Sequence, residues 1–289
     1  MISALDHDSW TEPPAAREAR VAADSLERGD VLFFPFLDFE IDAGEQALFS
    51  PAILSSAKNA SFHPVTARVG GTRVEGNDLD RLRGLMARFN ERANALVRSL
   101  APAYRDHLQV GRTSFRPAEI AGRASWWWQD DTRLHVDSFP ATPVQGRRIL
   151  RVFSNVNLEG KPRSWRVGDA FERVAARFAR TLRIPSPTGA AVLHLLRVTE
   201  TRRSAYDGLM LQLHNRMKRD ADFQACSPQM PFDFPAGTTW MAFTDQVSHA
   251  AMAGQYEMEQ TFLLPPAAML DESRSPLRIL ERLKHRRLV

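Results

Sequence analysis

The stretch Asp130-Asp-Thr-Arg-Leu-His-Val-Asp-Ser-Phe-Pro140 carries the pattern that decides the fold of this 289-residue chain. We predict a short strand over residues 134–137. Successive side chains of a strand point to opposite faces, so His135 and Asp137 share one face and converge on one point. Two histidines and one carboxylate, with the remaining positions open, form the ligand set of non-haem Fe(II) oxygenases. The H-x-D pattern therefore predicts two of three ligands of such a site.

The third ligand must be a histidine from a distant strand, and His249 fits best. It ends the segment Gly237-Thr-Thr-Trp-Met-Ala-Phe-Thr-Asp-Gln-Val-Ser-His249, which reads as a strand, a turn and then a histidine. An H-x-D alone is weak evidence in a chain with eight histidines, because a structural histidine is the commoner fate. His194, in an apolar run that we predict as a strand, and His214, on a predicted helix, are expected to be packing or surface residues.

Outward from this stretch the chain alternates short strand-like runs with helical segments. Apolar residues at three-four spacing behind an Asn77/Asp78 cap predict one long amphipathic helix that ends before Pro102. Further helices are predicted over residues 167–182, 205–220 and 276–287. Strands are predicted over residues 31–39, 125–128, 134–137, 149–156, 190–198, 238–243 and 261–264, with a hairpin between 59 and 76. The expected fold is mainly β with flanking helices (α+β), a β-sandwich or barrel decorated by helices.

The domain organisation expected from the sequence is simple. Residues 1–28 are polar and contain prolines, which predicts a loosely attached N-terminal arm. No linker divides the remainder, so residues 29–289 are expected to form a single domain with inserted helices and a C-terminal helix. The sequence contains no G-x-G-x-x-G, Walker loop or C-x-x-C pair, which argues against dinucleotide, P-loop and cysteine-zinc chemistry.

Composition excludes further classes. The only cysteine, Cys226, cannot build a disulfide framework, which favours a reducing compartment. No apolar run approaches the roughly 18 residues of a membrane span, and the first ten residues lack the features of a signal peptide. Of the 38 basic residues four are lysines, which leaves 34 arginines. Codon bias explains such an excess, and recognition of carboxylates or phosphates is the functional alternative.

Longer blocks of the sequence resemble a known family. The strand Arg148-Ile-Leu-Arg-Val-Phe-Ser-Asn-Val-Asn157 is similar to the strand that follows the H-x-D in prolyl-hydroxylase-like dioxygenases. Together with Arg112–Ile120, Asp130–Pro140, Pro162–Glu172 and Glu259–Pro265, it resembles the Kdo 3-hydroxylase (3-deoxy-D-manno-oct-2-ulosonic acid hydroxylase) family over nearly the whole chain. The resemblance implies a double-stranded β-helix (jelly-roll, cupin-like) enzyme that uses Fe(II), 2-oxoglutarate and O2, with ascorbate as the reductant in vitro. Its implied reaction is hydroxylation at C3 of the Kdo sugar on the lipid A precursor.

One departure from the wider superfamily concerns the co-substrate. A cation usually follows the distal histidine by about ten residues and holds the far carboxylate of 2-oxoglutarate, but residues 256–260 contain none. Asn155 aligns with the superfamily's co-substrate-binding tyrosine, and strand parity places Arg151 on the same inner face. Arg151 is the first candidate for the carboxylate clamp, and Arg148 is the second if a bulge shifts the register. A surface position for Arg151 is the alternative.

Several other groups have two readings each. Trp126–Trp128 either form an aromatic wall for a sugar ring or alternate between core and surface on a strand. The second interpretation is favoured. Asp130 and Asp131 either orient Arg133 or a ligating histidine, or form a turn. Trp165 and Arg166 match a family block, or are a core tryptophan and a solvated arginine.

The expected partner is the Kdo-containing lipid A glycolipid, with no role for nucleic acid, and the expected localisation is cytoplasmic. A polyanionic substrate would suit an arginine-rich rim, for which the candidates are Arg202, Arg203, Arg216, Arg219, Arg282, Arg286 and Arg287. Peripheral contact of the C-terminal helix with the cytoplasmic face of the inner membrane is an open alternative to docking on the body of the protein. The rival functions are an Fe(II)/2-oxoglutarate hydroxylase of another sugar or a protein side chain, and a non-catalytic metal- or nucleic-acid-binding barrel.

Overall fold

Two β-sheets form the centre of the molecule in the computed structural model, which describes residues 1–55, 58–123 and 125–289. The large sheet has the strand order β1-β2-β9-β6-β11-β5-β3-β4, and the small sheet has the order β10-β7-β8. All pairings are antiparallel except that of β1 with β2. The strand bounds are β1 Ile2–Ala4, β2 Val31–Phe34, β3 Ala60–His63, β4 Arg68–Gly70, β5 Gln109–Arg116, β6 Arg148–Asn155, β7 Arg163–Gly168, β8 Gln229–Phe234, β9 Thr238–Phe243, β10 His249–Ala253 and β11 Glu257–Leu264.

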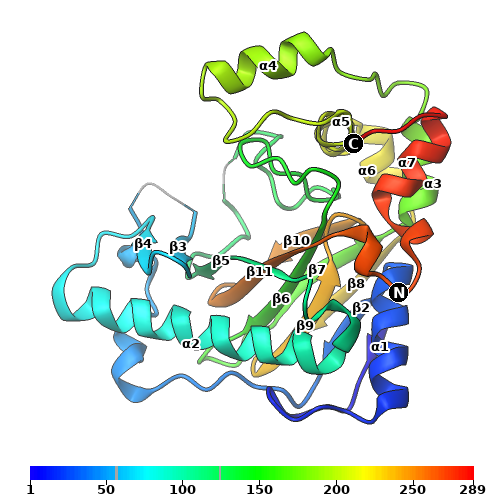
Figure 1. The fold of residues 1–289 in the computed structure, drawn as a ribbon. Helices are drawn as coiled ribbons and strands as arrows, with labels where there is room; N and C mark the ends of the chain where they lie inside the picture. Colours follow the sequence, from blue (N-terminus) through cyan, green and yellow to red (C-terminus); the bar gives the residue numbers. More distant parts are fainter. Residues whose placement is uncertain (56–57, 124) are drawn as a thin grey trace.

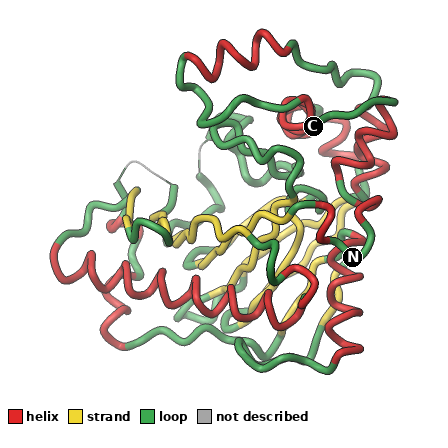
Figure 2. The backbone as a smooth tube through the Cα atoms, in the orientation of Figure 1, coloured by secondary structure: helices red, strands yellow, loops and turns green. Residues whose placement is uncertain are grey.

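Helices surround these sheets (Figure 2). Figure 1 shows α2 along the lower side of the large sheet, α1 at the lower right, α3, α5, α6 and α7 gathered at the upper right above α1, and α4 set apart at the top. The helix bounds are α1 Ala16–Arg28, α2 Gly76–Leu100, α3 Phe171–Phe178, α4 Pro187–Leu195, α5 Ala205–Arg219, α6 Ala221–Cys226 and α7 Pro276–Lys284. Short 3-10 turns span Ala43–Leu48, Pro51–Ile53, Pro102–Tyr104, Pro266–Ala268 and Glu272–Arg274.

Strand β6 is buried on both faces, and it carries its apolar residues as two adjacent pairs, Ile149-Leu150 and Val152-Phe153. Leu150 and Val152 pack outward against the core that α2 covers. Phe153 points inward and stacks on Trp240 of the neighbouring β9, in the core between the two sheets. The inward positions of β6 therefore lead into the space between the sheets, where a double-stranded β-helix holds its site.

The sequence predicted several of these elements closely. The long helix, the helix over 205–220 and the strand over 238–243 correspond to α2, α5 and β9. Other predictions were wrong. Residues 190–198 fall mostly in helix α4, and residues 125–128 form a turn. The predicted helix over 167–182 is shortened to α3, because Val167 and Gly168 complete strand β7.

The prediction of a loose arm over residues 1–28 is also wrong. Strand β1 pairs with β2, and α1 lies on the large sheet. Leu26 is fully buried, and Trp10 packs edge-on against Phe89 of α2. The signal that the prediction missed is the three-four spacing of Ala19, Ala22, Ala23 and Leu26, which form the buried face of α1.

No helix in the described part of the chain is long and apolar enough to cross a membrane. Helix α7 docks with its apolar side on the protein, since Leu277 and Leu280 are buried in the core shared with α3 and α5 and Leu283 packs against it. This is the arrangement that the sequence favoured for the C-terminal helix. Its apolar side is therefore not available for contact with a lipid surface.

Candidate metal and co-substrate site

A single β-bridge brings the two predicted histidine ligands together. His135 N donates to His249 O at 3.0 Å, and His249 N donates to His135 O at 2.9 Å. In place of the strand predicted over residues 134–137 the structure has an isolated bridge at His135. The side chains of His135 and Asp137 nevertheless converge, as the predicted strand required. One potential ligand atom from each of His135, Asp137 and His249 lies within 4.8 Å of the others, and all three residues are buried.

Hydrogen bonds fix the tautomer of both imidazoles. His135 Nδ1 lies 2.7 Å from Arg133 O, and His249 Nδ1 lies 2.8 Å from Val247 O. A carbonyl oxygen only accepts, so each Nδ1 carries the proton and each Nε2 keeps its lone pair. Burial lowers the pKa of both imidazoles and keeps them neutral. Neutral histidines oriented in this way are the form that binds metal ions.

Asp137 supplies the negative charge of the cluster. Burial opposes its ionisation, but the guanidinium of Arg151 outweighs that effect and holds the pKa of the carboxyl well below its usual range. Its Oδ2 lies 3.2 Å from Arg151 Nη1, yet it accepts no hydrogen bond from any described residue. A buried, ionised carboxylate oxygen without a hydrogen bond, next to two imidazole lone pairs, fits a divalent metal ion.

Cations and carboxylates alternate around the cavity of about 420 Å³ that contains these residues. Arg151 of β6 lies 3.3 Å from Glu259 of β11, and Arg116 of β5 donates to the other oxygen of Glu259 at 2.8 Å. Arg163 of β7 donates to Glu257 at 3.1 Å. In these pairings each of the three arginines has a carboxylate partner, so the buried charges of the cavity wall are compensated.

Three donors of the described cavity lining make no hydrogen bond, and one of them, Arg163 Nε, lies 2.9 Å from Glu257 as an ion pair, which leaves two donors without any partner. Arg151 Nε and Trp165 Nε1 are buried and donate to no described group. The Trp165 indole stacks on His249, with ring centroids 5.1 Å apart and an interplanar angle of 22°. Unpaired buried donors are costly, which points to a ligand acceptor at this place. A carboxylate next to the metal ligands fits these donors, and 2-oxoglutarate has two.

The structure separates the three residues predicted for the co-substrate. Arg151 faces the cavity, as strand parity required. Arg148 lies on the opposite face of β6, fully buried, where its guanidinium donates to Asp245 at 2.8 Å and to Gln246 at 2.5 Å. No bulge shifts the pairing of β6, so Arg148 cannot reach the cavity.

Asn155 does not serve the cavity either. Its amide Nδ2 donates to Lys161 O and Phe234 O, at 2.9 and 3.0 Å, and its Oδ1 accepts from Asn157 N. The side chain is therefore committed to backbone groups of the loop that follows β6 and of the end of β8. Asn155 occupies the strand position of the superfamily's co-substrate-binding tyrosine. In this protein the side chain at that position bonds to the protein backbone instead.

Sequence reasoning missed part of the cavity wall. Arg116, Arg163, Lys218 and His214 all line it. His214 lies outside the His135–Asp137–His249 cluster and packs edge-on against His135, with ring centroids 5.1 Å apart, so it is a packing residue as predicted, but one that forms part of the cavity wall. A usable signal existed for Arg163 and Trp165, which are two apart on one strand and therefore face the same way. No comparable signal marked His214, whose position depends on how α5 packs.

Asp130 accepts from Thr132 N at 3.0 Å and from Arg133 Nε at 3.1 Å, so it stabilises the turn that leads to His135. Asp131 accepts from Arg123 at 2.8 Å. Trp126 and Trp128 stack on each other in an exposed turn, with ring centroids 5.2 Å apart, and not on a strand.

The two facing sheets and the His135–Asp137–His249 cluster define a non-haem Fe(II) dioxygenase of the double-stranded β-helix type. More narrowly, the chain belongs to the 3-deoxy-D-manno-oct-2-ulosonic acid (Kdo) hydroxylase family, whose model matches residues 9–287. It is similar to the crystal structure of the Kdo hydroxylase KdoO with alpha-ketoglutarate and Fe(III), at 43% identity and a TM-score of 0.97, covering 100% of this chain and 97% of that one.

The cobalt(II) complex of KdoO has 44% identity and a TM-score of 0.98, and the complex with succinate and Fe(III) has 43% and 0.96, with the same coverage. No curated protein sequence matches the chain. The structural matches confirm the predicted fold class, the dioxygenase class, and Fe(II) and 2-oxoglutarate as the cofactor and co-substrate. A non-catalytic binding barrel is thereby set aside.

Proposed function

We propose that this protein hydroxylates C3 of the Kdo sugar on Kdo-containing lipid A, in the cytoplasm, with Fe(II), 2-oxoglutarate and O2. The observation that carries the proposal is the convergence of His135, Asp137 and His249 below two buried donors without acceptors. Residues 29–289 would act as one dioxygenase domain, to which strand β1 and helix α1 add their packing. Membership of the Kdo hydroxylase family supports the choice of sugar.

His135, Asp137 and His249 would hold the metal. The cation would neutralise the Asp137 carboxylate, and the two Nε2 lone pairs would complete one face of its coordination. Bound Fe(II) with 2-oxoglutarate and O2 supplies the oxidising chemistry. The protein contributes ligand geometry, since Arg133 O and Val247 O keep both rings turned toward the metal position.

Arg151 and Trp165 would bind the co-substrate carboxylates through the donors that have no partner among the described residues. Arg116 has two bonds to Glu259 and is the second cation on this wall, which lacks the cation that the superfamily places after the distal histidine. The predicted clamp thus stays with Arg151, while Arg148 and Asn155 keep structural roles. Phe153 and Trp165 line the same cavity and exclude water from it.

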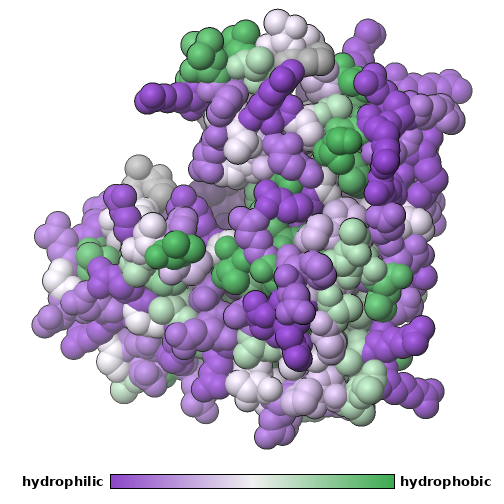
Figure 3. All heavy atoms as spheres, in the orientation of Figure 1, coloured by the Kyte–Doolittle hydropathy of each residue, from purple (hydrophilic) through white to green (hydrophobic). Residues whose placement is uncertain are grey.

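The substrate would enter through an adjoining cleft of about 780 Å³ that shares Arg116, Arg151, Phe139 and Glu259 with the metal cavity. Figure 3 shows this face of the molecule hollowed between the α4 segment at the top and the side that carries α2. Arg112 and Arg147 line the cleft. Their guanidinium groups suit the carboxylate of Kdo and the phosphates of lipid A.

The test measures turnover and product together. Purified protein with Fe(II), ascorbate and 2-oxoglutarate should form succinate when Kdo-containing lipid A is supplied, and mass spectrometry should find one added oxygen on the sugar. Asp137→Ala should abolish both, because it removes one ligand and the only carboxylate of the cluster. The control is Asp80→Ala, which changes an exposed aspartate on α2.

Absence of both turnover and iron binding in the wild type would overturn the proposal. Succinate formed with another sugar or a peptide, but never with Kdo-containing lipid A, would keep the enzyme class and replace the substrate. Sugar analysis of a deletion strain separates these outcomes in the cell, since loss of one oxygen per Kdo is expected only for the proposed reaction.

A further inference from the structure

Helix α4 and the turn that follows it form an apolar feature that the reaction does not explain. Val192, Leu195, Leu196 and Val198 are between 48% and 80% exposed, and the first three lie on one stripe of the helix. Figure 3 shows this apolar surface at the top of the molecule, above the hollowed face. A contiguous exposed apolar patch beside an active site marks a surface for an apolar partner.

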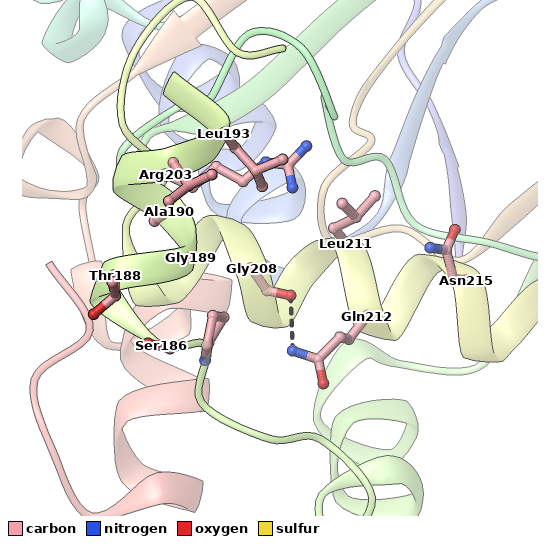
Figure 4. Close-up of a pocket in the computed structure, with 12 residues that line it drawn as sticks. Ser186, Thr188, Gly189, Ala190, Leu193, Arg203, Gly208, Leu211, Gln212 and Asn215 are labelled. Carbon is pink, nitrogen blue, oxygen red and sulfur yellow. Dashed lines mark hydrogen bonds between the residues drawn. The ribbon is translucent and has the colours of Figure 1, made fainter. Parts of the chain in front are cut away.

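Beneath this stripe lies a groove of about 640 Å³ between α4 and α5, within the range of roughly 300–1,000 Å³ typical of ligand pockets. Figure 4 shows Leu193 and Arg203 on one side of the groove and Leu211 and Gln212 of α5 on the other. Ala190, Val192 and Leu193 line the α4 wall. A Cβ added at Gly208 would lie 2.2 Å from Pro185, so this glycine lets the chain that leads into α4 pack closely against α5 at the groove.

Helix α5 connects the groove to the metal cavity. His214 and Lys218 line the cavity, while Gly208, Leu211 and Asn215 line the groove, and the 3.6-residue period places these two sets on adjacent faces of the helix. A helix with its side chains is roughly 10–12 Å across. A molecule with its reacting sugar at the metal can therefore place a neighbouring chain in the groove.

The segment that follows α4 also connects the groove with the substrate cleft and the metal cavity. Glu200 and Thr201 line the substrate cleft, and Arg203 lines the groove and donates to Pro140 O, next to the metal cavity. Residues 183–204 contain four arginines and one carboxylate, Glu200. An apolar groove with a basic border matches a ligand that is both anionic and acylated.

We infer that the groove between α4 and α5 binds an acyl chain of the glycolipid substrate while its Kdo sugar occupies the metal cavity. This inference rests on the proposed function and adds a lipid subsite to it. The groove supplies apolar contact, and the arginines beside it meet the phosphates. The subsite lets the enzyme distinguish an acylated acceptor from the free sugar.

Gly189 offers a direct test, because it lines the groove and a Cβ built on it meets nothing within 4 Å. Gly189→Phe would fill the groove, and replacing a helix-interior glycine does not weaken α4. The matched control is Ala191→Phe, which adds the same ring to an exposed position on the opposite face of the same helix. Both variants are assayed at fixed detergent with Kdo-containing lipid A and with its fully deacylated, still phosphorylated saccharide.

The wild type should have a KM at least about tenfold lower for the acylated acceptor, which is about 1.4 kcal/mol of apolar contact. Gly189→Phe should remove this preference and leave kcat/KM for the deacylated saccharide unchanged, while Ala191→Phe keeps the preference. Equal KM values for both acceptors in the wild type, or an acyl preference that survives in Gly189→Phe, would overturn the lipid subsite.

Sedimentation of the wild type and Gly189→Phe checks a second occupant. A wild-type dimer that the substitution dissociates would assign the groove to another copy of this chain and overturn the inference. These outcomes are distinct from failure of the proposed function, in which the wild type hydroxylates neither acceptor.

Discussion

Two arginines three positions apart on β6 have opposite fates, and the difference comes from strand parity. Arg151 points between the sheets toward Asp137, and Arg148 points outward to Asp245 and stacks 3.9 Å from the centroid of Phe243. The sequence identified both arginines as candidates for the clamp on the 2-oxoglutarate carboxylate. Because β6 pairs regularly with β9 and β11, the two side chains point to opposite faces and have different roles.

Substituting these two arginines should separate stability from co-substrate binding. Arg148→Met leaves Asp245 buried and unpaired, so the free energy of unfolding should fall by about 3–5 kcal/mol in urea denaturation. Arg151→Met should lower the free energy of unfolding less, because Glu259 keeps its bonds to Arg116, and it should weaken 2-oxoglutarate binding, because the Arg151 donors face the cavity. Equal loss of stability with unchanged 2-oxoglutarate affinity in both variants would contradict the assignment.

Trp165 provides a finer measurement at the same scale. Trp165→Phe keeps an aromatic ring beside His249 but removes the unpaired Nε1 donor. A hydrogen bond to a charged group contributes about 1.5–3 kcal/mol, so affinity for 2-oxoglutarate should fall about tenfold or more. Calorimetric titration of the Fe(II)-loaded protein without O2 measures this. Metal affinity should stay the same, and unchanged 2-oxoglutarate affinity would rule out the contact.

At the scale of elements, the N-terminal segment is part of the fold. Glu27 at the end of α1 is fully buried, accepts from Tyr104 at 2.8 Å, and accepts from the backbone of Leu270 and Asp271. It thereby ties three distant parts of the chain together. Burial and the Glu27 carboxylate raise the pKa of the Tyr104 hydroxyl, which remains a donor.

Leu26→Ala should therefore destabilise the whole protein. Leu26 is fully buried against the large sheet, and such truncations cost about 2–5 kcal/mol through lost burial and the cavity left behind. Val21→Ala, on the exposed side of the same helix, should change the free energy of unfolding by no more than about 0.5 kcal/mol. If both substitutions had similarly small effects in urea denaturation, residues 1–28 would be a loosely attached arm, as the sequence predicted.

For the whole molecule, pH dependence follows from its buried imidazoles. Burial is the main cause that lowers the pKa of His135, His214 and His249. Unfolded histidines titrate near pH 6.5, so below that value, down to the folded pKa, the unfolded chain binds more protons than the folded one. The free energy of unfolding therefore falls as the pH is lowered through this window.

The measurement is urea denaturation of metal-free protein, in chelator, from about pH 7 to about pH 5. His214→Gln should flatten the dependence because it removes one of the three groups. His107→Gln, which changes an exposed histidine, should leave the slope as it is in the wild type. A His214→Gln slope identical to that of the wild type would mean that His214 is not desolvated in solution.

Periodicity and spacing predicted the parts of the molecule that depend on local sequence. These include the long helix α2, the strands β6 and β9, and the grouping of His135 with Asp137. The features that the sequence did not predict depend on tertiary packing. Helix α4 has no polar face, so its apolar run predicts a strand as readily as a helix. His214 reaches the cavity only because of where α5 packs.

The bridge between His135 and His249 joins positions 114 residues apart with two backbone hydrogen bonds. During synthesis, the chain cannot present a complete ligand set until His249 has left the ribosome and both sheets have closed. A metal ion that needs all three ligands therefore binds only the folded chain, and a ligand that binds the folded but not the unfolded state stabilises the folded state. Iron supply would then set both the active fraction of the protein and its resistance to unfolding.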